Sequence, residues 1–426
     1  MDFSKFSKTP PHLKEAMELM KAGRLKEATT LIQSNLNGVA ADNNTDTNTD
    51  ANTNTMKDVT PDKPKLEDSA AKTAKSTNKE KPVSTDKPSS EPFNKLSDTL
   101  QDIADKMKDF KLDLPAAMDL SALGSGATTH SEPDIPANAQ FLKGTLKSAQ
   151  GNHSYRLYIP ASYEQALQKD LSLPLIVMLH GCTQSPEDFA TGTRMNELAE
   201  ENQCLIVYPS QPTSANPNRC WNWFQPSDQH QGQGEPAWLA ALTRSIIKDY
   251  AVDSSRVYVA GLSAGAAMAI IMAEAYPDLY AAVGVHSGLA YRSATDLPSA
   301  MMAMRKGSSA SSSPTKNGKF VPTIILHGDQ DHTVSIRNGE QIFEQAKQRL
   351  QAQKSDLNTQ QHQCGSKQNR RSTQLEIRDN KGNSQLKYWK IHGAGHSWSG
   401  GSSAGSYTDP NGPDASKEML RFFLSH

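Results

Sequence analysis

The sequence predicts an α/β domain over residues 138–426, with a mainly parallel sheet covered by helices on both faces. Short runs rich in Val, Ile, Leu and Tyr repeat along this region, for example LPLIVMLHG, CLIVYPS, RVYVAG and FVPTIILHGD. Helical patterns such as PAWLAALTRSIIKDYAV and SIRNGEQIFEQAKQRLQ separate them. Strands that alternate with helices are typical of parallel sheets, and about 290 residues are enough for one α/β domain with a deep core.

The residues before this domain have a different composition. Residues 1–36 predict a helical N-terminal segment, because HLKEAMELMKAGRLKEATTLIQSNL contains two amphipathic stripes broken at Gly23. Residues 37–137 are rich in Asn, Thr, Ser, Lys and Pro, a composition typical of a disordered linker. Near residues 94–111, apolar residues three and four apart predict an amphipathic helix that binds a partner, a surface or its own domain.

Charge and hydropathy exclude several classes of protein. The 426 residues carry a formal net charge of −1, so no strong basic field indicates nucleic acid as a partner. No apolar run reaches the roughly 18 residues of a transmembrane helix. The first residues lack the basic and apolar regions of a secretory signal, which favours a cytoplasmic location. The four cysteines are too few for a disulfide scaffold, and neither they nor the histidines have metal-ligand spacing, so we expect no metal and no cofactor.

Within the α/β domain, a strand meets a helix with almost no loop at GLSAG, residues 261–265. In such a turn the central Ser263 takes a strained conformation that exposes its hydroxyl, and the flanking glycines allow the close approach of strand and helix. The N-terminus of the helix supplies free N–H groups beside the serine. A second match, at residues 401–405, has no strand before it and no helix directly after it. Ser263 is therefore the candidate nucleophile, with a helix N-cap serine as the alternative.

A serine hydroxyl needs a base that takes its proton and an acid that orients the base. In this architecture the chain order is Ser, then Asp or Glu, then His. Asp331 follows the strand FVPTIILHG and His396 follows the strand QLKYWKIHG, so both lie at carboxyl ends of strands. Asp329 and His392 are the competing candidates, but they lie closer to the strand ends, where turn-capping and structural roles are expected.

The backbone N–H groups of Cys182 and Ala264 are the candidate donors to the oxyanion that forms during attack. Ala264 directly follows the nucleophile, and Cys182 lies in HGCTQ at the end of the LPLIVMLHG strand. A catalytic cysteine at position 182 is the competing interpretation, but no strand–turn–helix context surrounds it.

Seven stretches from about residue 140 onward resemble the poly(3-hydroxybutyrate) (PHB) depolymerase family of esterases, which has the α/β-hydrolase fold. They are LHGCTQSPEDFA, CWNWFQ, GEPAWL, RVYVAGLSAGAAM, HGDQDHTV, GAGHSWSGG and GPDASKEMLRFF. The resemblance implies a triad of Ser263, Asp331 and His396 that hydrolyses polyester or short-chain carboxylic esters. Feruloyl and acetylxylan esterases are relatives, so carbohydrate esters are the alternative substrates. A non-catalytic protein bound to polymer granules is the competing class of function.

Many members of the family are secreted, so an extracellular location is the alternative to the cytoplasm. The stretch AMELMKAGRLKEATTLIQSNL resembles the helical leader of bacterial members without a signal peptide, which favours action on intracellular polymer granules.

Aromatic and cysteine residues near the predicted site leave two questions open. Trp221, Trp223 and Trp398 are candidates to line an apolar cleft for polyester chains, with ordinary packing under a loop as the alternative. Cys182 and Cys220 can form a disulfide in an oxidising compartment and stay reduced in the cytosol.

Overall fold

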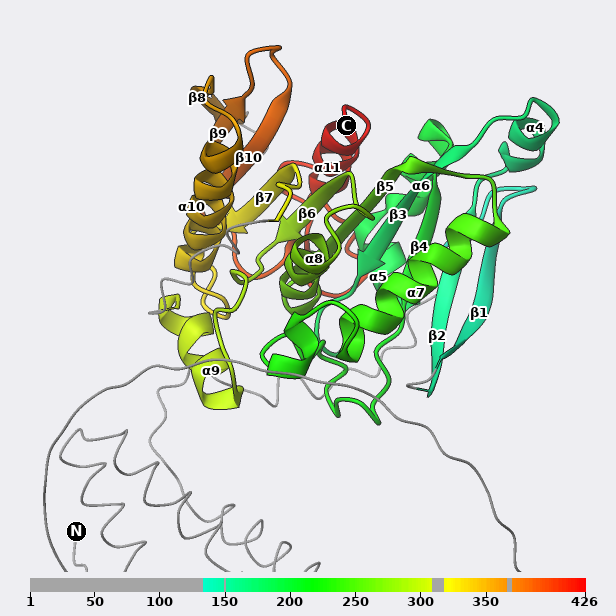
Figure 1. Cartoon of the computed structure of the whole chain (residues 1–426), viewed down its shortest axis with the longest axis horizontal. Helices are drawn as coiled ribbons and strands as arrows, with labels where there is room; N and C mark the ends of the chain where they lie inside the picture. Colours follow the sequence, from blue (N-terminus) through cyan, green and yellow to red (C-terminus); the bar gives the residue numbers. More distant parts are fainter. Residues whose placement is uncertain (1–132, 149–150, 309–317, 366–369) are drawn as a thin grey trace, which may run out of the picture. The chain divides into compact units, whose positions relative to one another are not determined.

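The computed structural model describes residues 133–148, 151–308, 318–365 and 370–426. The helical segment expected at 1–36, most of the linker expected at 37–137 and the helix expected near 94–111 lie outside the described residues. A central sheet has the strand order β1-β2-β4-β3-β5-β6-β7-β10-β9-β8 (Figure 1). Its strands are β1 (Gln140–Ser148), β2 (Gly151–Ile159), β3 (Leu173–Leu179), β4 (Leu205–Pro209), β5 (Val252–Leu262), β6 (Ala282–His286), β7 (Thr323–Gly328), β8 (Asn358–Cys364), β9 (Ser372–Arg378) and β10 (Ser384–Ile391).

The middle of this sheet is parallel, and its two edges are antiparallel. Strands β4, β3, β5, β6, β7 and β10 pair in parallel, whereas β1, β2, β9 and β8 are added in antiparallel fashion. Parallel strands have both faces covered and are therefore apolar throughout, as in LPLIVML of β3, where every residue is buried. This arrangement confirms the predicted α/β-hydrolase fold.

Helices cover both faces of the sheet. They are α4 (Tyr163–Gln168), α5 (Pro186–Thr193), α6 (Met195–Asn202), α7 (Gly234–Asp249), α8 (Ala264–Ala275), α9 (Leu297–Lys306), α10 (Ile336–Gln353) and α11 (Ala415–Phe423), with a 3-10 turn at Pro226–Gln229. A separate short pair consists of β11 (Trp398–Ser399) and β12 (Thr408–Asp409). Within the described residues, no helix combines the length and the hydropathy that a bilayer crossing needs.

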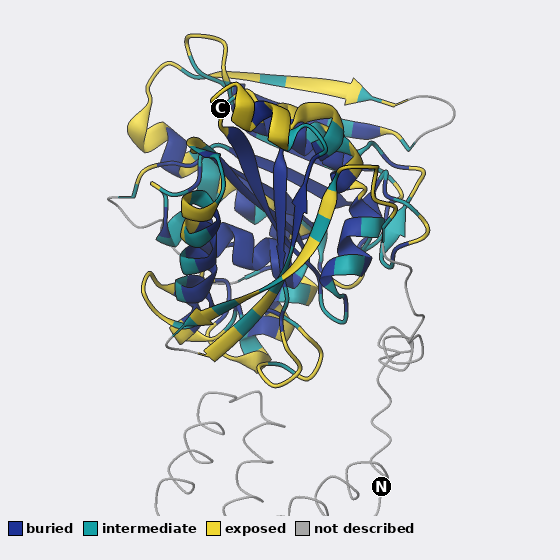
Figure 2. Ribbon diagram, turned by 90° about the vertical axis from the view of Figure 1, so that its right-hand side faces the viewer, coloured by how far each residue is buried: buried dark blue, intermediate teal, exposed yellow. Residues whose placement is uncertain are grey.

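Two cores lie on opposite faces of the sheet. Along β5, Val257 and Val259 belong to the core that includes residues of α7, α8 and α10, and Tyr258 and Ala260 belong to the core that includes residues of α5, α6 and α11. This alternation follows from the two-residue period of a strand. Figure 2 shows the resulting layers, with a buried sheet between helices whose outer surfaces are exposed. The layers leave the carboxyl ends of the parallel strands free to carry functional loops.

Candidate active site

Ser263 occupies the turn between β5 and α8, with a backbone φ of 56° and ψ of −119°. A positive φ is strained for a residue with a side chain, and such strain is concentrated at functional turns. The Ser263 N–H donates to His286 O at 2.9 Å, and Ser263 O accepts from the Ala267 N–H at 3.0 Å. These two hydrogen bonds hold the turn in place.

Two glycines make the turn possible. A Cβ atom on Gly261 would overlap the backbone of Gly265, and one on Gly265 would overlap the carbonyl oxygen of Leu179 at the end of β3. The first turn of α8 therefore lies directly against the carboxyl end of β3. The second match to the motif, at residues 401–405, lies in a loop.

Asp331 and His396 form a close pair at the ends of β7 and β10. His396 Nδ1–H donates to Asp331 Oδ2 at 2.7 Å, and the Asp331 side chain is completely buried. Its other oxygen, Oδ1, accepts from the N–H groups of Thr333 at 3.0 Å and Val334 at 2.8 Å. Burial opposes ionisation, but hydrogen bonds from His327 and His396 outweigh it, so the pKa of Asp331 lies well below its ordinary value. A buried carboxylate therefore fixes the orientation of the His396 ring.

The competing candidates form a second pair. Asp329 accepts from His392 Nδ1 at 2.8 Å and from the Gly393 N–H at 2.8 Å. The other ring nitrogen of His392 is hydrogen-bonded to Thr373 Oγ1 at 2.9 Å. Because both nitrogens of His392 are occupied, this ring is not available to take a proton from a substrate or a nucleophile.

His286, the last residue of β6, connects the serine turn to the histidine loop. Its carbonyl oxygen accepts from Ser263, and its Nε2 accepts from the Ser399 N–H at 3.1 Å. Burial lowers the pKa of His286 to about 3, so the ring is neutral and able to accept. The Ser263 turn and the segment directly after His396 are therefore attached to one residue, at one edge of the sheet. Among the described residues, no hydrogen bond joins Ser263 Oγ to His396.

The two candidate oxyanion donors are also at this edge. The N–H groups of Cys182 and Ala264 have no acceptor among the residues that the structure describes. The loop that carries Cys182 is held on both sides, because the Gly181 N–H donates to Gln184 Oε1 at 2.9 Å and the Thr183 N–H donates to Asn218 O at 2.7 Å. Free N–H groups in a rigid loop and at a helix N-terminus are suited to stabilise an anion.

Part of the chain is similar to known esterases. Residues 153–356 match the family described as "Esterase PHB depolymerase". This part of the chain is similar to the PHB depolymerase family of esterases. Poly(3-hydroxyalkanoate) depolymerase C of Paucimonas lemoignei is 36% identical over 40% of this chain and 44% of its own length. Feruloyl esterase B of Thermothelomyces thermophilus is 35% identical over 31% of this chain and 45% of its own length. A probable acetylxylan esterase A of Aspergillus clavatus is 36% identical over 27% of this chain and 37% of its own length. The chain thus spans less than half the length of these curated relatives.

A disulfide joins Cys182 to Cys220, with 4.2 Å between the two Cα atoms. The bond ties the loop that carries Cys182 to residues 218–224, which we call the strap. The sulfur of Cys182 is therefore not a free thiol in this structure, and the competing interpretation of a catalytic cysteine is wrong for this state. The sequence did not decide whether Cys182 and Cys220 form a disulfide, and in this structure they do.

The three candidate tryptophans are buried. Trp221 is 0% exposed and its Nε1–H donates to His180 O at 3.0 Å, while Trp398 is 1% exposed and its Nε1–H donates to Ser416 Oγ at 3.0 Å. Trp223 is 6% exposed. These contacts favour packing under the loop, and a substrate contact by these rings stays a prediction.

Sequence reasoning missed the carboxyl group that holds the strap. Glu235, at the start of α7, accepts from the Asn222 N–H at 2.8 Å, from Asn222 Nδ2 at 2.7 Å and from Gln211 Nε2. Gln211 also donates to Cys220 O at 3.0 Å and to His180 Nε2 at 3.2 Å. Burial, reinforced by the neighbouring Asp228, raises the pKa of Glu235 to about 8. The GEPAWL stretch contains this glutamate, but nothing local in it indicates these partners.

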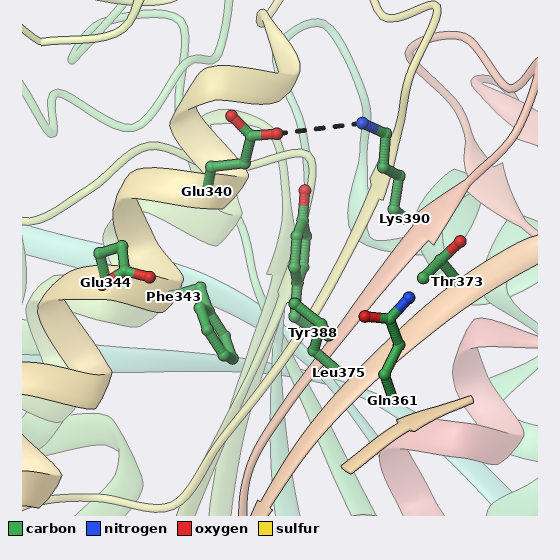
Figure 3. Close-up of a pocket in the computed structure, with 8 residues that line it drawn as sticks. All are labelled: Glu340, Phe343, Glu344, Gln361, Thr373, Leu375, Tyr388 and Lys390. Atoms are coloured by element: carbon green, nitrogen blue, oxygen red, sulfur yellow. Dashed lines mark ion pairs between the residues drawn. The ribbon is translucent and has the colours of Figure 1, made fainter. Parts of the chain in front are cut away.

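A pocket of about 350 Å³ lies away from Ser263, between α10 and strands β8–β10 (Figure 3). The hydroxyl group of Tyr388 is buried there and has no hydrogen-bond partner among the described residues, and Lys390 lies 4.0 Å from Glu340 at one side. The lining residues are Glu340, Phe343, Glu344, Gln361, Thr373, Leu375, Tyr388 and Lys390. None of them is a candidate catalytic residue. In the part of the chain that the structure describes, no three His, Cys, Asp or Glu side chains are grouped as metal ligands.

Proposed function

We propose that the chain is a serine esterase that works through an acyl-enzyme. Ser263 Oγ attacks the ester carbonyl carbon while His396 takes the hydroxyl proton, and the alcohol leaves with that proton when the tetrahedral intermediate collapses. A water molecule then attacks the acyl-enzyme, again with His396 as base, and the carboxylic acid is released. Asp331 stabilises the imidazolium that forms in both halves of the reaction.

The observation that carries this proposal is the Asp331–His396 pair beside the strained turn of Ser263. The 2.7 Å hydrogen bond fixes the proton on Nδ1 and leaves Nε2 as the base. Hydrogen bonds between a nucleophile and its base are often long in the absence of substrate, so a missing Ser263–His396 bond does not argue against the assignment.

The N–H groups of Cys182 and Ala264 are assigned as the oxyanion hole. Their support is the absence of any competing acceptor among the described residues and their position at the ends of β3 and β5. Removal of one such donor typically costs about 100- to 1,000-fold in kcat, so both positions are expected to matter.

The proposed substrates are aliphatic polyesters such as PHB, supported by the named activity of the Paucimonas lemoignei relative. Feruloyl or acetylxylan esters are the second candidate, supported by the names of the fungal relatives. Attachment to polymer granules through residues before 138 stays a prediction.

The place of action is part of the proposal. The Cys182–Cys220 disulfide supports an oxidising compartment, because cytosolic thiols are kept reduced. The extracellular alternative is therefore favoured over the cytoplasmic location that the sequence predicted.

Labelling with a fluorophosphonate and a substrate panel test the proposal. Wild type should be labelled and should hydrolyse p-nitrophenyl butyrate, and Ser263→Ala should do neither. Amorphous PHB and acetylated xylan then separate the two substrate candidates. Equal labelling of both proteins would remove Ser263 from its assigned role.

A further inference from the structure

Helix α9 presents an unusual cluster of exposed apolar side chains. Leu297 is 58% exposed, Met301 42% and Met302 62%, whereas Ala300 and Ala303 of the same helix are buried. At 3.6 residues per turn, Met301 and Met302 lie on the side opposite the two alanines, and Leu297 lies beside Met301 at the border of that side. Single exposed apolar residues are ordinary, but a group of them on one helix face indicates an interaction surface.

This face lies at the edge of the sheet that carries the candidate triad. Helix α9 is in the connection that leaves the carboxyl end of β6, and its own end is bonded to the start of α10, where the loop after β7 ends. There, the Ser335 N–H donates to Met304 O at 2.7 Å, and Asn338 Nδ2 donates to Ala303 O at 2.9 Å. Asp331 belongs to the same loop. Figure 1 shows α9 at the end of the domain opposite to α4.

The charges around the α9 face are mainly positive. Arg305 and Lys306 are exposed in its last turn, and Arg292 is exposed shortly before it. The nearby Asp296 is engaged as the N-cap, where its side chain accepts from the Ser299 N–H at 2.8 Å. Hydrolysis of a polyester leaves carboxylate chain ends on the polymer, so a surface under attack becomes anionic. An apolar face with a basic border complements both properties of that surface.

Building on the esterase function proposed above, we propose that the exposed face of α9 (Leu297, Met301 and Met302) is the surface on which the enzyme adsorbs to a water-insoluble aliphatic polyester. Adsorption there places the polymer at the edge of the sheet where Ser263 acts. A hydrated polysaccharide offers little apolar area to such a face, so the assignment favours polyester over acetylated xylan.

The test compares two sets of substitutions in the full-length chain. The first variant is Leu297→Ser with Met301→Ser and Met302→Ser. The matched control is Leu167→Ser with Leu171→Ser, which removes apolar side chains that are 43% and 50% exposed in α4 and directly after it. Adsorption to amorphous PHB particles is measured by depletion from solution in a Ser263→Ala background, so that no polymer is consumed.

We expect the α9 variant to lose at least about tenfold in adsorption and, with Ser263 present, in polymer erosion. Hydrolysis of soluble p-nitrophenyl butyrate should stay within about twofold of wild type, and the α4 control should adsorb normally. Unchanged adsorption of the α9 variant overturns the assignment, and so does an equal loss in the α4 control. Stronger adsorption to phosphatidylglycerol vesicles than to PHB also overturns it, because the face would then bind membranes. Because adsorption is measured without catalysis, a failure of the esterase proposal appears separately, as missing turnover of the soluble ester.

Discussion

Replacing aspartate by asparagine should affect kcat very differently in the two aspartate–histidine pairs. Asp331→Asn keeps the size of a side chain that is completely buried, so no water can replace the lost carboxylate. The amide must either leave His396 Nδ1–H without its charged acceptor or donate to Nδ1. In the second case the ring proton moves to Nε2, which can then no longer accept a proton from Ser263.

The size of the expected effect follows from this tautomer change. A triad whose histidine is held in the wrong tautomer loses about 10⁴-fold in kcat, which corresponds to about 5.5 kcal/mol of transition-state stabilisation. We therefore expect Asp331→Asn to lose about 10³- to 10⁴-fold in kcat with p-nitrophenyl butyrate. Thermal unfolding followed by circular dichroism shows whether the variant is folded at the assay temperature.

Asp329→Asn is the matched control. It removes the charge of the acceptor in the 2.8 Å bond to His392, whose second nitrogen is held by Thr373, so the change affects a structural pair. We expect kcat within about threefold of wild type and a midpoint of thermal unfolding lowered by a few degrees. A large loss of kcat in Asp329→Asn, with Asp331→Asn nearly unaffected, would refute the assignment of the triad.

Three further substitutions test the surroundings of the site. Cys220→Ser releases the loop that carries Cys182, so kcat should fall about tenfold. A reductant should lower the kcat of wild type but not that of the variant. A wild type whose kcat does not change with reductant contradicts this. Glu235 has a pKa of about 8 in the folded chain, above its ordinary 4.5, so its contribution to stability is lost as pH rises from about 4.5 through 8. Urea unfolding should show wild type less stable at pH 9 than at pH 5, and Glu235→Gln should reduce that difference by roughly 3 kcal/mol; an equal difference in both proteins contradicts the buried carboxyl. Gly265→Ala pushes a Cβ atom into the backbone of β3 and should destabilise the fold by about 3 kcal/mol, and a variant with an unchanged unfolding midpoint would contradict the close packing.

Local sequence patterns predicted the structure correctly where it depends on a single element. The apolar run of β3 indicates a strand buried on both faces, and GLSAG between a β-branched run and an alanine-rich helix indicates the Ser263 turn. Strand β8, with the sequence NTQQHQC, gave no signal, because most of its residues are exposed and it is held by backbone pairing with β9. Its formation depends on a neighbouring strand, which no periodicity in the segment reports.

Contacts between distant residues account for what sequence reasoning missed at the site. Glu235 is 13 residues from Asn222 and 24 residues from Gln211. A single glutamate at a helix start is otherwise explained by the helix dipole, so its structural role has no local signature. The Cys182–Cys220 disulfide depends on the distance between two loops and on the redox conditions, and neither can be calculated from a spacing of 38 residues.

The two proposed oxyanion donors therefore have different physical origins. The Ala264 N–H is fixed by the helix that it begins, so only changes in the Ser263 turn or in α8 can displace it. The Cys182 N–H lies in a loop whose position depends on the disulfide and on the strap, which Glu235 in turn holds through Asn222 and Gln211. Changes in the strap should therefore weaken one donor while the nucleophile, the base and the other donor stay in place. Because an oxyanion hole acts on the transition state, such changes should lower kcat more than they raise KM.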